Sequence, residues 1–363
     1  MLFTLVGLVT VTASGVGGPT GTTAADHALE PRLAMLTGLK CSVCHVNRTG
    51  GGARTAFGAA YGQTQLPART EGYPFRNRAL NDWISVGANV RVVGSAAVTD
   101  ATPQTSIETE RANVYLEARL IPDRLAIYAD EKLGPGQAGA REVFGLVESL
   151  PLNGYAKFGK FLPPFGLRIV DDLAFTRDVT GFNFQTPDQG VEVGVEPGPL
   201  SVFVAVSNGS GGAAEGDDQK QVTGSAVWVS RRVRLGASAS RNRLGTNTRD
   251  VLGAYGGFNI GTFSLTGEVD RVRDRQGVSD RRQVVVYGAG NLLLRRGVNA
   301  RVTYGYHDRD TDVPEDQRVR IRVGLEVFPI PLLQASAYLT VLDDIPQAPA
   351  QQDRVSMELH FFF

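Results

Sequence analysis

The chain has 363 residues with 37 basic and 37 acidic side chains, so its formal net charge is zero. This balance excludes the strongly basic composition that is typical of nucleic-acid-binding proteins. Beyond the N-terminus no run of 18 or more apolar residues occurs, which excludes a helical membrane span in the mature chain.

Residues 1–25 are predicted to be a secretory signal peptide. Leu2 to Val16 are apolar or small, and Gly, Thr and Ala follow up to about Ala25, as in the apolar core and cleavage region of an export signal. A basic stretch before the apolar core is missing, which indicates an atypical signal or a true start upstream of Met1. The alternative is a buried apolar helix of the mature protein.

Residues 26–80 contain the most informative motif. The only two cysteines of the chain stand as Cys41-Ser-Val-Cys44 and are followed at once by His45. C-x-x-C-H is the attachment pattern of a c-type haem, because two thiols form thioethers and the adjacent imidazole can ligate the iron. A redox disulfide usually lies in a thioredoxin-like βαβ pattern, and none surrounds this motif. A structural zinc site needs about four ligands, and no second C-x-x-C exists. In a structural disulfide the histidine directly after Cys44 would be a coincidence. The motif therefore predicts one covalent haem c, and the export that its attachment requires supports the signal peptide.

The residues around the motif predict a small helical haem segment. Leu33, Met35, Leu36 and Leu39 share one side of a short helix, and 50–52 is a glycine run whose backbone can lie close to a flat ligand. About fifty residues are too few for a stable core, so the haem and a neighbouring surface must both contribute.

Two aromatic residues and four possible ligands complete the haem segment. Phe57 and Tyr61 lie four residues apart and are expected to pack on the haem, or within the small core of the segment. The second axial ligand of the iron is open: His27 and Met35 are the local candidates. His307 and His360 are distant in sequence, although His360 is placed to point into the interior of the remaining domain.

Residues 81–363 alternate apolar and polar side chains in sixteen segments, as β-strands with one apolar face do. Tight turns, such as the one at 196–199, alternate with longer polar loops at 207–220, 241–250, 307–317 and 343–353. Short turns on one rim and long loops on the other are typical of an outer-membrane barrel whose short rim is periplasmic. The pattern predicts an all-β, 16-stranded antiparallel transmembrane barrel in the bacterial outer membrane, with both termini periplasmic.

Two further features support the barrel. The last strand alternates and ends in Phe361-Phe-Phe363, which resembles the terminal strand of outer-membrane barrels. The stretch 157–166 resembles a segment common in porins of the phosphate-selective type. The loop that follows, 163–188, is expected either to fold inward as a constriction or to form an outer lid. Its carboxylates Asp171, Asp172 and Asp178 are expected to be solvated.

Together, the haem motif, the element Phe57-Gly-Ala-Ala-Tyr61 and the barrel resemble the fused outer-membrane cytochrome–porins of iron-oxidising bacteria. Thr37-Gly38 before the first cysteine also fits, whereas the glycines at 50–52 stand where that family usually has a proline-containing run. The resemblance implies a porin-like barrel that holds the haem segment at or inside its periplasmic mouth. It implies electron transfer from an extracellular donor such as Fe(II) to a periplasmic cytochrome; the residues equally allow the reverse direction.

Two alternatives remain at this point. The first is a diffusion porin in which the haem segment is structural or a plug, and lumen residues such as Arg111, Glu117 and Arg320 set the selectivity. The second is a periplasmic or surface cytochrome with a soluble β-domain, whose apolar strand faces would pack together.

Overall fold

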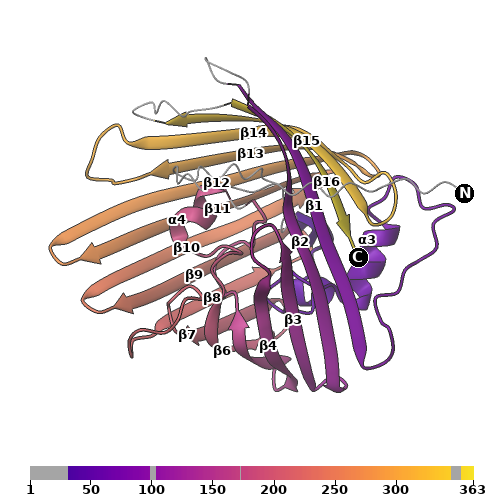
Figure 1. Cartoon of the computed structure of the whole chain (residues 1–363), viewed down its shortest axis with the longest axis horizontal. Coiled ribbons are helices and arrows are strands. Elements are labelled where there is room, and N and C mark those ends of the chain that lie inside the picture. Colours follow the sequence, from indigo (N-terminus) through magenta and orange to yellow (C-terminus); the bar gives the residue numbers. More distant parts are fainter. Residues whose placement is uncertain (1–31, 99–103, 172, 345–352) are drawn as a thin grey trace, which may run out of the picture.

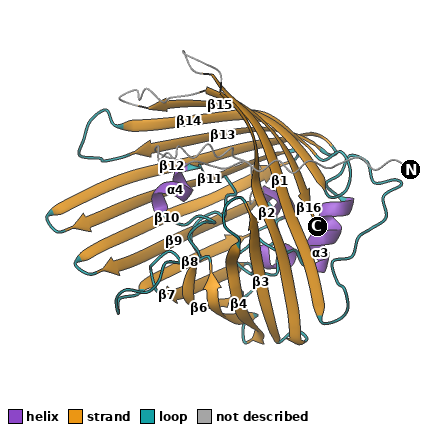
Figure 2. Cartoon of the chain, viewed as in Figure 1, coloured by secondary structure: helices purple, strands orange, loops and turns teal. Residues whose placement is uncertain are grey.

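The fold is a closed antiparallel β-barrel, seen in a computed structural model that describes residues 32–98, 104–171, 173–344 and 353–363 (Figures 1 and 2). The predicted signal peptide and His27 lie outside these residues. The strands of the wall are β1 (Ile84–Val98), β2 (Gln104–Ile121), β3 (Leu125–Gly134), β4 (Gly139–Leu150), β5 (Gly154–Phe161), β6 (Asp188–Val195), β7 (Leu200–Ser207), β8 (Gln221–Val229), β9 (Val233–Leu244), β10 (Asn247–Ile260), β11 (Phe263–Gln276), β12 (Ser279–Arg295), β13 (Val298–Asp308), β14 (Gln317–Val327), β15 (Leu333–Asp344) and β16 (Asp353–Phe362).

Each strand pairs with its neighbours in sequence, and the first strand closes the barrel on the last. β1 pairs antiparallel with β16, for example Val92 opposite Leu359. The predicted sixteen-stranded antiparallel barrel is therefore confirmed. Closure leaves no strand edge with unpaired backbone groups, which is the condition for crossing a bilayer with strands.

The burial of side chains is inverted relative to a soluble protein. In β14, Arg320, Arg322 and Glu326 are buried and point inward, while Ile321 and Leu325 alternate with them and are exposed on the outside. The same alternation recurs around the wall, so the apolar face is turned outward, where a bilayer would cover it. A soluble β-domain would bury these residues, and that alternative is excluded.

The described residues also form four short helices apart from the wall: α1 (Arg32–Thr37), α2 (Cys41–Cys44), α3 (Ala56–Thr64) and α4 (Phe175–Thr180). None of the helices among the described residues is long and apolar enough to cross a membrane. The first three belong to the N-terminal segment, which we define as residues 32–83 and which lies at the short-turn end near the C-terminus (Figure 1). The fourth lies between β5 and β6, in a stretch that we call the inner loop, residues 162–187.

The prediction of a long loop at 241–250 is wrong. Residues 241–250 are mostly strand, because β9 and β10 continue to a tight turn at Gly245, whose φ is +60°. Ion pairs across and beside this hairpin, Arg241 with Asp250 and Arg249 with Asp274, give the polar side chains partners on extended strands. Polar composition alone therefore did not distinguish an extended hairpin from a loop.

Candidate functional site

The N-terminal segment is bound to the inner wall of the barrel by buried and partly buried ion pairs on several sides. Arg32 pairs with Glu326 of β14, and Arg78 pairs with Glu117 of β2. Arg48 lies 2.9 Å from Glu148 of β4 and 3.0 Å from Glu196, just after β6. Because these partners stand on widely separated strands, the segment is fixed across the lumen rather than attached at one edge.

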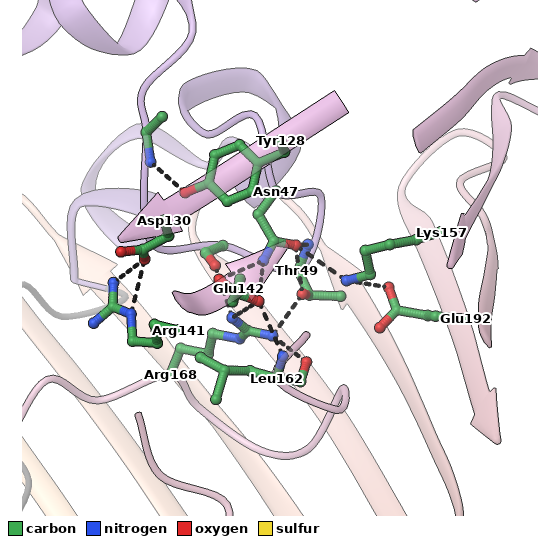
Figure 3. A network of polar contacts seen from close by, with 12 residues as sticks. Asn47, Thr49, Tyr128, Asp130, Arg141, Glu142, Lys157, Leu162, Arg168 and Glu192 are labelled. Carbon is green, nitrogen blue, oxygen red and sulfur yellow. Dashed lines mark hydrogen bonds and ion pairs between the residues drawn. The ribbon is translucent and has the colours of Figure 1, made fainter. Parts of the chain in front are cut away.

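The deepest contact of the segment is a buried polar network around Asn47 (Figure 3). The Asn47 amide nitrogen donates to both oxygens of Glu142, at 3.0 and 3.2 Å. Lys157 donates to the Asn47 amide oxygen at 3.2 Å and pairs with Glu192 at 2.9 Å. Buried charges are tolerated only when they are paired and hydrogen-bonded, so this network requires the segment to stay in place.

The inner loop folds into the lumen and meets the N-terminal segment there. Arg168 donates to the Gly50 carbonyl at 3.1 Å and to the Thr49 hydroxyl at 2.8 Å. The backbone N–H of Leu162 donates to Glu142 at 2.9 Å, so one carboxylate holds both inserted parts (Figure 3). Of the two predicted positions, the inward one is correct.

The expectation of solvated acidic side chains in this loop is wrong for Asp171. Its carboxylate is 1% exposed and pairs with Arg320 at 2.8 Å and Arg322 at 3.3 Å, both on β14. Asp178 is exposed, as expected, and Asp172 lies outside the described residues. The loop sequence carries no sign of this contact, because its partners are 149 and 151 residues away.

The C-x-x-C motif forms one helical turn, α2. The His45 N–H donates to the Cys41 carbonyl at 2.9 Å, so His45 follows directly on the helix end. Both cysteines are free thiols. A Cβ on Gly58 would collide with the Cys44 backbone, so α3 packs against α2 at a distance that only glycine allows.

The glycine run at 50–52 turns the backbone back beneath the motif. Gly50, Gly51 and Gly52 have φ values of +97°, +79° and +67°, a left-handed conformation that residues with a Cβ rarely adopt. The turn is held from the wall side, where the Ala53 N–H donates to the hydroxyl of the buried Tyr128 at 3.0 Å. The predicted close approach of the glycine backbone to a ligand surface is thus geometrically possible.

A large cavity opens beside Cys41, Cys44 and His45. It contains about 1620 Å³ of space that no atoms fill, including a part that is open to solvent. The N-terminal segment, the inner loop and the barrel wall all contribute to it. Its apolar lining includes Leu33, Leu39, Tyr115, Phe165, Leu167, Phe184, Phe203, Val227 and Tyr255.

The polar lining of the cavity is predominantly cationic. Seven basic side chains face it against one carboxylate, Glu196; they are Lys40, Arg48, Arg54, Arg111, Arg141, Arg168 and Arg234. Arg234 is 5% exposed, and its Nη2 lies 3.6 Å from the Cys41 sulfur. An apolar cavity with this rim fits a flat apolar ligand that carries carboxylate groups.

Burial and the charge of Arg54 lower the pKa of His45 to about 4. The imidazole is therefore neutral at neutral pH, and neutral imidazole is the form that ligates a metal. Burial raises the pKa of Cys44, with a smaller effect from Cys41, and lowers the pKa of Arg54 to about 10. The Nδ1 atom of His45 is buried without a hydrogen bond of normal geometry.

The predicted site residues are only partly brought together. Tyr61 lines the cavity, but Phe57 does not: its ring is 48% exposed and stacks on Tyr61 at 6.3 Å between ring centroids. Met35 is buried but is not part of the cavity lining. The cavity wall formed by the described residues contains one histidine, His45, and no methionine.

The two distant histidines lie elsewhere on the wall. His360 points inward, as predicted, and its Nδ1 lies 2.6 Å from Gln334, while His307 lies 3.0 Å from Gln283 near the other end. Among the described residues no three His, Cys, Asp or Glu side chains are grouped so that they could hold a metal ion. A haem fits this donor set because the porphyrin supplies four of the iron ligands and the protein needs to supply one imidazole.

Several residues that form the site could not be recognised from the sequence. Glu142, Arg234 and Tyr128 are lumen-facing by their alternation, but alternation gives the face of a strand and not the depth at which a residue meets an inserted segment. Arg54 and Arg168 stand in irregular segments, where no period exists. Only the tertiary arrangement identifies them.

Comparison with known proteins supports the barrel and says nothing of the N-terminal segment. No protein-family model matches the chain, and no curated protein does. The anion-selective porin from Comamonas acidovorans matches with a TM-score of 0.62 at 10% identity, covering 77% of this chain and 99% of that one. OmpT of Vibrio cholerae matches with a TM-score of 0.59 at 13% identity, covering 79% of this chain and 100% of that one. The outer membrane channel DcaP of Acinetobacter baumannii matches with a TM-score of 0.60 at 10% identity, covering 77% of this chain and 97% of that one. The chain thus has the barrel fold of outer-membrane porins.

Proposed function

We propose that this barrel carries one covalent c-type haem on Cys41 and Cys44, with His45 as an axial ligand, and transfers electrons across the outer membrane. The observation that carries the proposal is that both free thiols and a neutral imidazole open on the same lumen cavity. A bound haem would supply a one-electron Fe(III)/Fe(II) couple.

The residues of the chain have distinct roles in this proposal. Cys41 and Cys44 anchor the group, and the left-handed turn at 50–52 leaves room for a flat ligand against the backbone. Buried arginines of the cavity, Arg234 among them, offer partners for its carboxylates. The barrel separates the site from the hydrocarbon of the bilayer, which electrons do not cross unaided.

The direction and partners belong to the same proposal. With the short-turn end in the periplasm, as in outer-membrane barrels generally, both termini are periplasmic. An extracellular reductant such as Fe(II) would then give an electron on the long-loop side, and a periplasmic cytochrome would receive it at the short-turn side. The resemblance to the fused cytochrome–porins of iron oxidisers is the reason to test Fe(II) first.

A diffusion porin is the second candidate, and the comparisons favour it over electron transfer. One of the structures compared above is named an anion-selective porin and another an outer membrane channel, and neither name mentions haem. The cationic lining of the cavity would suit the passage of anions. Against a wide channel stand the two inserted segments, which are fixed to the wall by buried ion pairs.

One preparation tests both candidates. The protein is purified from a host that attaches haem, and its visible spectrum is compared with that of a Cys41→Ser/Cys44→Ser variant. We expect the spectrum of thioether-linked haem in the parent protein only. Haem-loaded protein in liposomes that enclose oxidised cytochrome c should reduce it when Fe(II) is added outside.

The same protein is then placed in planar bilayers. A sheathed electron conduit should show little conductance, whereas a diffusion porin should show large steps. If the parent protein acquires no haem in that host and shows large conductance steps, the electron-transfer proposal is overturned in favour of the porin. Haem-loaded protein that fails to reduce the enclosed cytochrome, with its orientation checked, would do the same.

A further inference from the structure

The short-turn end of the barrel is positively charged although the whole chain is neutral. Its exposed basic residues are Arg69, Arg76, Arg124, Arg231, Arg232, Arg295 and Arg296. The exposed acids at this end are Glu71, Asp82, Asp123 and the C-terminal carboxylate at Phe363. Seven cations against four anions leave three positive charges here, and the rest of the chain carries the balance.

These seven arginines have no carboxylate partner among the described residues, whereas several arginines at the opposite end do. At the long-loop end, Arg241 pairs with Asp250, Arg273 with Asp280, and Arg309 with Asp344. Of the seven arginines at the short-turn end, Arg296 donates to a backbone oxygen, the Thr64 carbonyl. Unpaired surface cations keep their charge available for an approaching anionic surface.

Apolar side chains of the N-terminal segment are exposed at the same end. Val43, in the middle of the C-x-x-C helix, is 36% exposed, and Phe57 of α3 is 48% exposed. The Thr55 hydroxyl donates to the Val43 carbonyl at 2.6 Å, which keeps these two neighbourhoods together. The segment is also joined to the rim itself, since Lys40 donates to the Leu200 carbonyl at 2.8 Å at the start of β7.

We propose that this end is the docking surface for a small soluble redox protein with an acidic face. Its centre would be Val43 and Phe57, and the surrounding rim would be the arginines of the turns and of the N-terminal segment. An apolar centre with a charged rim, small in area, is the usual anatomy of a transient electron-transfer contact. The inference rests on the proposed function and adds to it the location and charge of the partner.

A protein partner fits the arrangement better than lipid headgroups do. Headgroup phosphates can reach arginines on the outer side of the turns, but they lie in the plane of the bilayer beside the barrel. Val43 and Phe57 belong to the segment that fills the mouth, so a partner that covers them must approach along the barrel axis. Lipid is therefore treated as an outcome of the test.

The test uses two forms of one probe, lysine-rich cytochrome c and its succinylated derivative, in which the lysines carry carboxylates. Binding of each to haem-loaded protein in nanodiscs of zwitterionic lipid is measured at low and high salt. We expect the succinylated form to bind at least tenfold more tightly at low salt and to lose this preference at high salt. Arg231→Gln/Arg232→Gln should weaken its binding about tenfold, while Arg281→Gln/Arg282→Gln at the other end should leave it unchanged.

Several outcomes overturn the docking surface. They are equal binding of the two probes, equal loss in both double variants, and binding of anionic vesicles by this end without binding of the succinylated probe. The Cys41→Ser/Cys44→Ser variant separates this inference from the function. If it still binds the succinylated probe, the surface stands whether or not electrons flow. If haem-loaded protein transfers electrons without preferring that probe, the function stands and the surface falls.

Discussion

The barrel wall and the two segments inside it are held by different kinds of interaction. The wall is a continuous ladder of backbone hydrogen bonds between sixteen strands, in which a single side chain contributes little. The N-terminal segment and the inner loop contain helices of only four to nine residues and are fixed by a few buried ion pairs. This difference indicates that a single substitution can detach the N-terminal segment or the inner loop from the wall while the barrel stays folded.

The largest effect is expected from Glu142→Ala. This carboxylate holds Asn47 of the N-terminal segment and the backbone of Leu162 in the inner loop, and removing one partner of a buried charged network costs about 3–5 kcal/mol. We expect both segments to become sensitive to protease and the bilayer conductance to rise, while the barrel keeps its β-sheet circular dichroism.

Glu71→Ala is the matched control, because Glu71 is an exposed carboxylate of the same N-terminal segment. It should behave as the parent protein in both measurements. If the two variants show the same conductance and the same protease pattern, the buried network does not hold the lumen contents.

A smaller effect is expected from Gly58→Ala, which tests the packing of α3 on α2 within the N-terminal segment. The added Cβ would meet the Cys44 backbone, and overpacking of this kind costs about 1–3 kcal/mol. We expect less haem per protein by visible absorbance and earlier thermal loss of the haem-region signal. Gly62→Ala on the same helix is the control, since its Cβ would lie at ordinary contact distance, 3.4 Å, from the Phe362 ring. Equal haem content in the two variants would contradict the close packing of α3 on α2.

The smallest effect is expected from Met35→Leu. Met35 is buried outside the cavity lining, and a volume-conserving swap of this type usually costs less than about 1.5 kcal/mol. The visible spectrum of the haem-loaded protein should not change. A shift in that spectrum on substitution would show that Met35 ligates the iron.

The sequence was sufficient for the wall because its rule is local. Period-two alternation specifies which face of a strand is apolar, and turn residues such as those at 196–199 mark the ends, so the sixteen strands could be predicted within a few residues. It was less reliable where polar strands extend beyond the membrane. There the sequence around Arg241 and Asp250 is as polar as a loop, although both residues lie on paired strands and form an ion pair.

The C-x-x-C-H motif is likewise a local signal, since Cys41, Cys44 and His45 lie within five consecutive residues. What only the tertiary structure decided is where that motif lies and what surrounds it. Asn47 meets Glu142 across 95 residues, Arg48 meets Glu196 across 148, and Asp171 meets Arg320 across 149. Such contacts follow from closure of the barrel, which sets the depth of every lumen side chain and the residues that lie opposite it across the lumen. Local patterns do not contain that information, because closure is a property of all sixteen strands together.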